Sequence, residues 1–407
     1  TRRDMSSSVL NASEAQPDVE KEPLVSDKDQ KQTTLSGIQK ALLGGEDHDE
    51  WDCTQYHMDN LTTWTAFLLT KGAAFDKPGT WRCMACAITV SICMAVYTQI
   101  GIYGVSISKI DLFVHRLSTF LNVFVGFLLG FFLSSSMLRW YSCTNAFLQL
   151  LDSVRSMQMQ MIALGVDRER CDMLTRYGIL SAWLLHLSLN TPNQKAGSEE
   201  DLRLSARERT FEWLEQARPH LVQAREKQRL LRHPESYALL WTWVASLIGR
   251  MSQDGEIPPM ASPTYGRIIE IVEMAYGSIR EVRALDLVKA PFVYVHTLAV
   301  LVHVNHILNA ISFGLVVGMT TQAAMGKADR NLRSDLPRLV SSLFMAFCMS
   351  MVAPFLYLAL LDVCVCISQP FTYVEGKIPA LKFIRNLEED IINAAVMADN
   401  TKWEKPR

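Results

Sequence analysis

Three histidines in one apolar stretch are the side chains whose type and spacing could do chemistry most directly. His296, His303 and His306 lie there together with Asn305 and Asn309. Histidine titrates near neutral pH, so the group could sense pH or contact an anion. Polar groups at membrane depth usually face the protein interior or water, so hydrogen bonding between helices is the alternative that we favour. No carboxylate or cysteine stands at helical spacing from the histidines, which argues against a metal site.

Cys83 and Cys86 have the spacing of a redox pair, the second pattern with chemical potential. They open an apolar segment without the strand and turn that accompany redox-active pairs, so we interpret them as packing residues. The chain also has no Gly-rich phosphate loop, nucleophile elbow or zinc-binding helix motif. The sequence therefore predicts that the protein is not an enzyme and that it needs no metal or other cofactor.

The elements that must position these residues are apolar blocks long enough to cross a membrane. The averages, 49% apolar and 20% charged residues with a formal net charge of −2, conceal this concentration and give no indication of nucleic-acid binding. A block of about 20 apolar residues spans the hydrocarbon core as a helix, because lipid leaves no other partner for the backbone polar groups. We therefore predict an all-α integral membrane protein with four transmembrane helices. The expected spans are 81–103, 117–138, 291–319 and 339–367.

The other parts of the chain are predicted from composition and periodicity. The first 50 residues are polar, without a signal-peptide core, and we expect them to be disordered. Apolar residues at three- and four-residue spacing predict a helical domain in the centre of the chain. Its expected helices are 144–165, 169–189, 203–231, 235–252 and 264–288, and a last helix is expected at 381–397. The predicted parts are a tail (1–50), a pre-membrane segment (51–80), the first two spans (81–141), the central domain (142–290), the last two spans (291–367) and a C-terminal segment (368–407).

Basic residues at the membrane ends predict the topology. Four spans place both termini and the central domain on one side, and Arg139, Arg155 and Lys289 assign that side to the cytoplasm. The connector before the fourth span is also basic and favours the opposite orientation, but it does not flank the central domain. Arg139, Trp140 and Tyr141 are typical of an interfacial anchor, in which the rings lie at headgroup depth and the guanidinium extends to water.

Three ordered stretches resemble the bestrophin family. Residues 127–141, from Phe-Leu-Leu-Gly-Phe to Arg-Trp-Tyr, are similar to the family's Phe-x-Leu-Gly-Phe segment that closes on Arg-Trp-Trp. Residues 286–294 resemble its Asp-x-x-x-x-Pro-Leu-x-Tyr. Residues 369–391 contain Gln-Pro-Phe-Thr, Ile-Pro-Ala-Leu and Asn-Leu-Glu-Glu-Asp-Ile, which resemble Asn-Pro-Phe-Gly, Leu-Pro-Leu and Ile-Glu-x-Asp-Leu. Together with Arg176-Tyr177, the resemblance covers residues 75–397.

The resemblance implies a funnel-like homopentamer around one axial, anion-selective pore. The family's hydrophobic neck then falls on Val123, Phe127 and Phe131. Their spacing places them on one helical face. Five such faces would form apolar rings that gate by dewetting, and the positive edges of the phenyl rings can favour anions. Packing of the same face against neighbouring helices is the alternative.

Two further expectations concern the cytoplasmic side. The resemblance implies a second constriction near Met260, Pro263 and Thr264, without settling which side chain faces the pore. Animal bestrophins carry an acidic run after the Pro-Phe pair that helps to bind calcium, whereas this chain has Glu375 and Lys377 there. Calcium takes six to eight oxygen ligands, so we predict no calcium activation through this segment, as in the bacterial and plastid branches.

These expectations add up to a channel for chloride, with bicarbonate as a further candidate ion. The expected partners are four further copies of the chain, the lipid bilayer and small anions, and no nucleic acid. A secondary carrier is one alternative, although the halves show no visible repeat and only Pro354 interrupts a span deeply. A non-conducting membrane scaffold is another. The expected location is the plasma membrane, with a plastid thylakoid or other internal membrane as the alternative.

Overall fold

A computed structural model describes most of the chain after residue 77. The described residues are 78–100, 107–190, 199–257, 262–326, 332–371 and 376–400. Every regular element within these ranges is a helix, so the predicted all-α class is confirmed. The expected disordered tail and nearly all of the pre-membrane segment lie outside the described residues.

Three helices of the described part are long and apolar enough to cross a membrane: α4 (Pro78–Ile100), α5 (Ile107–Ala163) and α11 (Phe292–Gly326). Helix α5 is longer than expected, because the second span and the separate helix expected at 144–165 form one element of 57 residues. Its sequence has no Gly or Pro between Gly130 and Gly165, so nothing interrupts the hydrogen-bond ladder. Gly165, with a φ of 69°, follows the helix and allows the chain to turn.

The expected fourth span is divided into three consecutive helical segments. They are α12 (Leu332–Phe347), the π-helical segment Cys348–Val352 and α13 (Ala353–Ile367). Pro354 explains why the backbone hydrogen bonds change from the α-helical to the π-helical pattern, because proline donates no backbone hydrogen bond and its ring crowds the preceding turn. Helix α13 is apolar but has only 15 residues, so the fourth span remains a prediction that needs α12 and α13 together.

The remaining helices form the central and C-terminal parts. The expected helix at 203–231 is divided, because Pro219 lies between α7 (Glu199–Ala217) and α8 (Ala224–Leu231). Helix α9 (Ser236–Gln253) ends before Gly255, which has a φ of 73°. The other helices are α6 (Arg168–Asn190), α10 (Ser262–Leu287) and α14 (Ala380–Asn400).

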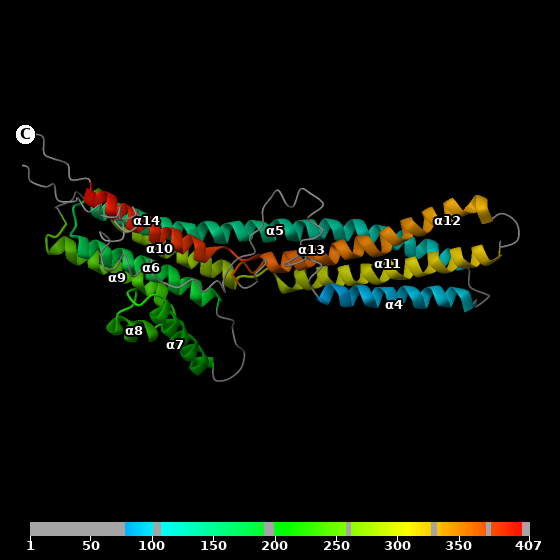
Figure 1. Ribbon diagram of the computed structural model, residues 1–407, viewed down its shortest axis with the longest axis horizontal. Helices are drawn as coiled ribbons and strands as arrows, with labels where there is room; N and C mark the ends of the chain where they lie inside the picture. The colour runs from blue at the N-terminus through cyan, green and yellow to red at the C-terminus, as the bar shows by residue number, and fades with distance from the viewer. Residues whose placement is uncertain are drawn as a thin grey trace, which may run out of the picture. The chain divides into compact units, whose positions relative to one another are not determined.

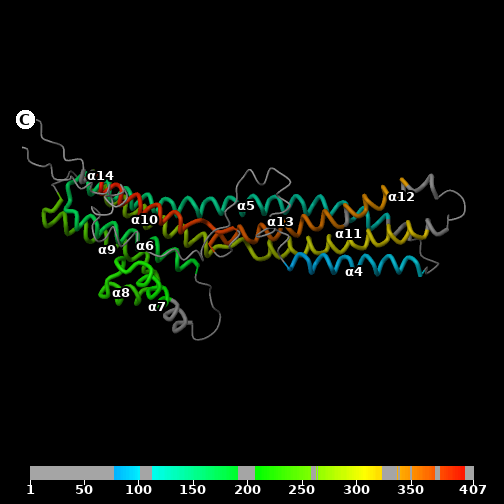
Figure 2. The backbone as a smooth tube through the Cα atoms, viewed as in Figure 1, coloured from blue at the N-terminus to red at the C-terminus, as the bar shows by residue number. Residues whose placement is uncertain are grey.

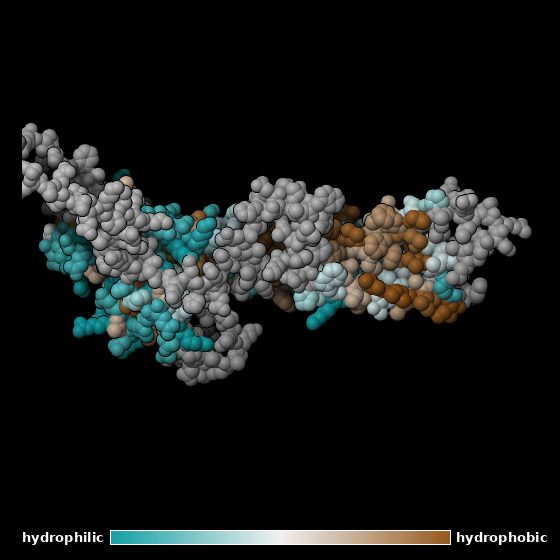
Figure 3. Space-filling model, viewed as in Figure 1, coloured by the Kyte–Doolittle hydropathy of each residue, from teal (hydrophilic) through white to brown (hydrophobic). Residues whose placement is uncertain are grey.

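Helix α5 links the two groups of helices. Its first part packs against α11 and α13, and its second part packs against α10, α6 and α14 (Figure 1). The tube in Figure 2 shows α4 beside α11 along the same part of the molecule, in agreement with their contacts. Hydrophobic residues gather over α4, α12 and α13, whereas hydrophilic residues dominate over α7 and α8 (Figure 3). The apolar helices thus lie at one end of α5 and the polar ones at the other.

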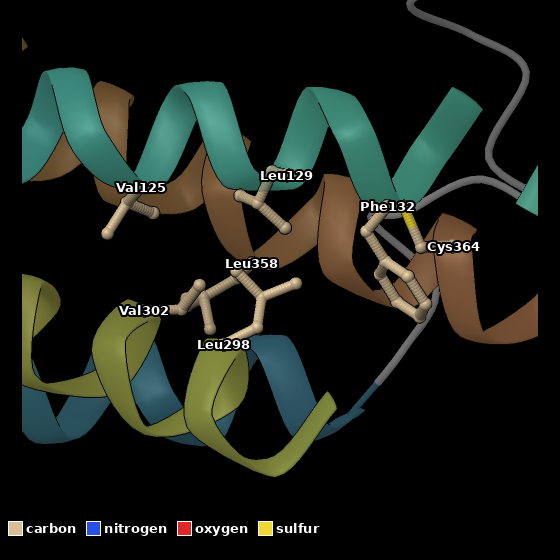
Figure 4. Packing of buried hydrophobic residues seen from close by; sticks show 7 residues of the cluster. All are labelled: Val125, Leu129, Phe132, Leu298, Val302, Leu358 and Cys364. Carbon is tan, nitrogen blue, oxygen red and sulfur yellow. The ribbon is translucent and has the colours of Figure 1, made fainter. Parts of the chain in front are cut away.

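Between the apolar helices, side chains from three elements form one buried cluster (Figure 4). On α5 the buried residues recur at three- and four-residue spacing, which turns one face of the helix toward α11 and α13. The cluster consists of Val125, Leu129, Phe132, Leu298, Val302, Leu358 and Cys364.

Helices α4 and α11 approach each other through small residues. A Cβ atom at Gly314 would collide with the carbonyl oxygen of Ser91, and one at Gly318 would collide with Thr98. Ser91 Oγ also donates a hydrogen bond of 2.9 Å to the carbonyl of Ala310. Small residues at four-residue spacing allow close backbone packing where lipid removes the hydrophobic driving force. This contact fixes α4 against α11.

Candidate pore-lining face

The three expected neck residues form a row on α5 that no described part of the chain covers. Val123, Phe127 and Phe131 are 73%, 63% and 56% exposed, respectively. Val125 and Leu129, on the opposite face of the same helix, are buried in the cluster of Figure 4. The structure therefore places the row where it can meet lipid, a pore or another copy of the chain.

Two further aromatic rings lie beside this row, and Phe120 extends it by almost one turn. Phe120 and Phe124 are also exposed, and their rings stack with centroids 6.2 Å apart. The rings of Phe127 and Phe131 meet edge to face at 4.7 Å. Sequence reasoning missed Phe120 and Phe124, although their three- and four-residue spacing to the row could have identified them. Edge-to-face rings present positive edges, which attract anions weakly.

The character of the exposed face changes along α5. Arg116 is exposed seven residues before Val123, and Leu138 continues the apolar part beyond Phe131. Further on, Asn145 and Gln149 are exposed at the same spacing. The face therefore has a cation at one end, an apolar and aromatic middle, and polar amides at the other end. Hereafter it is called the α5 outer face, from Arg116 to Gln149.

A buried polar cluster lies behind the α5 outer face. Asn305 Nδ2 and Asn309 Nδ2 donate to Asn122 Oδ1 at 2.7 and 3.1 Å, and Ser118 Oγ donates to Asn309 Oδ1 at 2.6 Å. All four side chains are buried. Polar side chains in a membrane span are costly unless they are paired. Their pairing favours one rotation of α5 relative to α11, and this rotation turns Val123 outward.

Helix α13 also contacts the neck segment. Tyr357 Oη donates to the backbone carbonyl of Asn122 at 3.1 Å, and a Cβ atom at Gly126 would be 3.7 Å from the Tyr357 ring. Tyr357 follows the π-helical segment by five residues. The irregular part of the expected fourth span is therefore close to the backbone that carries the neck row.

The three expected intramembrane histidines do not come together. His306 is buried, and its Nε2 lies 3.1 Å from the carbonyl oxygen of Cys83 on α4. His296 and His303 are exposed on another face of α11, and His296 lies 5.3 Å from the ring of Phe292. His306 thus makes the contact between helices that the sequence favoured, whereas a role for the other two in pH sensing or anion contact remains a prediction.

Arg139 differs from the expected interfacial anchor. Its side chain is half-buried, and Nη2 donates a hydrogen bond to the carbonyl of Leu285 in the last turn of α10. The last carbonyls of a helix lack intrahelical partners and carry negative partial charge, so they attract the guanidinium away from water. Trp140 Nε1 donates to the carbonyl of Gly376 at 2.9 Å, and Tyr141 is exposed. Arg139 therefore joins α5 to α10 through a hydrogen bond. Anchoring of these residues at the membrane–water interface remains a prediction.

The expected cytoplasmic constriction is only partly described. Met260 and the side chain of Thr264 lie outside the described residues, and Pro263 is exposed in the first turn of α10. Glu375 lies outside them as well. Among the described side chains, no group of three or more His, Cys, Asp or Glu residues could hold a metal ion.

The apolar helices and the uncovered α5 outer face define an integral membrane protein. A protein-family model described as "Bestrophin, RFP-TM, chloride channel" matches residues 88–373, which is more than half of the chain. The chain therefore belongs to the bestrophin family, and the resemblance drawn from the sequence is confirmed. The comparison with curated proteins finds no match.

Solved structures agree on the fold. A bacterial bestrophin homologue from Klebsiella pneumoniae is similar with a TM-score of 0.55 and 16% identity, over 80% of this chain and 98% of that chain. A mutant of a Klebsiella pneumoniae homologue gives a TM-score of 0.55 and 15% identity, over 78% and 98%. A crystal structure described as a membrane protein gives 0.56 and 16%, over 78% and 98%. At such identities the likeness concerns the fold alone.

Proposed function

We propose that this chain is one subunit of an anion channel that conducts chloride, with bicarbonate as a further candidate ion. The family is described as a chloride channel, which supports the class of function. The observation that carries the proposal is the α5 outer face, in which an apolar and aromatic row stays uncovered while the opposite face of α5 is packed.

The pore forms between copies of the chain. A single chain cannot enclose a path along the α5 outer face, because no described element covers it. Five copies around an axis would bring Val123, Phe127 and Phe131 into stacked rings. Such a constriction excludes water when it is narrow and conducts when it widens. Beyond it, Asn145 and Gln149 would give the ion polar walls.

The proposed topology uses α12 and α13 together as the fourth span. With four spans, the central domain and both termini lie on the same side. Arg155 and Lys289 support the cytoplasmic side for that domain by the positive-inside rule. The plasma membrane is the proposed location, with a plastid thylakoid or other internal membrane as the alternative.

Substitutions in the row test this proposal in planar bilayers. Phe127→Ala and Phe131→Ala would remove the apolar constriction, so we expect a higher open probability or conductance. Phe344→Ala is the matched control, because Phe344 is a similarly exposed aromatic residue on a different helix, α12. If both α5 substitutions leave conductance and gating at the Phe344→Ala level, the neck assignment is wrong even when the protein conducts. Slow saturable flux would indicate a carrier, and no flux a scaffold.

A further inference from the structure

A pocket of about 430 Å³ lies outside the expected spans, where three helices of the central domain meet. Helix α6 contributes Tyr177, α8 contributes Arg225 and Arg229, and α9 contributes Trp243 and Arg250. The volume is within the range of small-molecule sites in proteins. The pocket does not include any residue of the α5 outer face, so the proposed pore gives it no role.

Three of the lining side chains are arginines that pair with no other side chain in the described part of the protein. Arg225, Arg229 and Arg250 are exposed, and within the described part of the chain their guanidinium groups make no ion pair or hydrogen bond. Two of them stand four residues apart on α8, a spacing at which like charges destabilise a helix. Arg225 also lies near the helix N-terminus, where a positive charge is unfavourable. Arg229 and Arg250 stand in the last turns of α8 and α9, where a positive charge is favourable. Helix stability therefore explains part of this charge, but not Arg225 or the pairing of two arginines on α8.

The negative charge of Glu226, the acidic residue that lines the pocket, is already balanced by an ion pair with Arg176. Glu226 accepts hydrogen bonds from Arg176 Nη1 and Nη2 at 2.7 and 2.8 Å, and from Tyr177 Oη at 2.8 Å. Burial alone would raise the pKa of Glu226, but these hydrogen bonds and the charge of Arg176 outweigh it and lower the pKa. Glu226 thus joins α8 to α6 as a carboxylate. Its charge is matched by Arg176, so among the described lining residues no acidic side chain is left to balance Arg225, Arg229 and Arg250.

The pocket also has an apolar and aromatic wall. Trp243 and Tyr177 are half-buried, with ring centroids 6.0 Å apart in an edge-to-face arrangement. Met173 and Leu247 also line the pocket. A flat group could rest on this wall with little loss of side-chain freedom, since the rings already fix each other. The pocket therefore combines a surplus of guanidinium groups with a surface for a ring.

We propose that this pocket binds a small organic phosphate, whose phosphate groups contact Arg225, Arg229 and Arg250 and whose flat part rests on Trp243. Guanidinium groups bind phosphate oxygens through two parallel hydrogen bonds, which suits a ligand that carries several such oxygens. A monocarboxylate would need only one of the three arginines. The site is independent of the proposed pore, since its ligand would bind without crossing the membrane.

Isothermal titration calorimetry on the purified full chain tests the proposal, with pyrophosphate, phenyl phosphate and benzoate as probes at one ionic strength. We expect both phosphates to bind and benzoate to bind at least tenfold more weakly. Equal affinity for benzoate, or no heat of binding with either phosphate, would overturn the proposal.

Variants assign the binding to this pocket. The double change Arg225→Gln and Arg229→Gln, and separately Arg250→Gln, should each weaken both phosphates at least tenfold. Trp243→Leu should weaken phenyl phosphate and leave pyrophosphate unchanged. Arg232→Gln is the matched control, because Arg232 is an exposed arginine that caps α8 outside the pocket. Affinities that stay at the Arg232→Gln level in both arginine variants would place the binding elsewhere and contradict the proposal.

Discussion

Asn305 on α11 donates a hydrogen bond of 2.7 Å to the side-chain oxygen of Asn122, the residue immediately before Val123 on α5. The bond joins the packed side of α5 to a helix that is 183 residues away in sequence. Because Asn122 points inward, Val123 and the residues four and eight positions later point outward. The orientation of the proposed neck thus depends on a buried polar contact.

Replacing Asn122 should loosen this arrangement. Asn122→Ala leaves the amide of Asn305 without its acceptor and removes one of the acceptors of Asn309 Nδ2. We expect a loss of roughly 0.5–2 kcal/mol of stability. Thermal unfolding of the purified protein would show a lower midpoint. Asn145→Ala is the control, since Asn145 is an exposed asparagine on the same helix. Equal midpoints for the two variants would show that the buried cluster contributes nothing.

A pair of glycine substitutions tests the contact between α4 and α11. Gly314→Ala places a Cβ atom against the Ser91 carbonyl and 2.7 Å from the Met94 Cβ atom, so we expect clear destabilisation. Gly277→Ala on α10 meets nothing within 4 Å and should stabilise by up to about 1 kcal/mol, through helix propensity. Unfolding midpoints compare the two. A Gly314→Ala protein as stable as the Gly277→Ala protein would contradict the close approach.

His186 should make the central domain sensitive to acid. Burial, and then the positive charge of Lys377, lower the pKa of His186 to about 3. Between about pH 6.5 and pH 3, the unfolded chain therefore binds a proton at His186 that the folded chain does not bind. Stability is then full above about pH 6.5 and falls toward pH 3, by up to ~1.4 kcal/mol per pH unit.

Unfolding measured at pH 7 and pH 5 checks this expectation. The change His186→Gln should reduce the loss of stability between the two values, because glutamine takes up no proton. His233→Gln serves as the control, since His233 is exposed. The same loss in the His186→Gln and unsubstituted proteins would exclude His186 as its source.

Arg116 should concentrate anions at one end of the proposed pore. It stands seven residues before Val123 on the α5 outer face. Arg116→Gln should lower the single-channel chloride conductance at low salt, and the effect should fade at high salt because ions screen exposed charges. Arg82→Gln on α4 is the control with the same change of charge. A conductance drop that persists at high salt would point to a structural cause.

The sequence predicted the elements better than their contacts. The neck row follows from one helix, because Val123, Phe127 and Phe131 share a face by spacing alone. The hydrogen-bond partners of Asn122 could not be predicted in this way, because they depend on how α5 crosses α11. Pro354 indicated an interruption, but the widening of the ladder into a π-helical segment depends on the packing around it.

Distance along the chain also explains what the sequence missed at the two polar sites. Arg139 and the two aromatic residues after it are typical of a membrane anchor. The hydrogen bond from Arg139 to a carbonyl at the end of α10 depends on how α10 packs beside α5, which the sequence does not show. The phosphate pocket needs α6, α8 and α9 together, and Arg176 and Glu226 are 50 residues apart. By itself, the basic stretch on the short amphipathic helix α8 is typical of a solvent-exposed face, so the sequence alone does not indicate a pocket.

The reversal potential of single-channel current tests the central claim most directly. The purified full chain would be reconstituted in a planar bilayer with a tenfold gradient of potassium chloride. An anion channel should give discrete openings whose current reverses close to the equilibrium potential of chloride. Reversal near the potassium potential, or an absence of discrete openings, would contradict an anion channel.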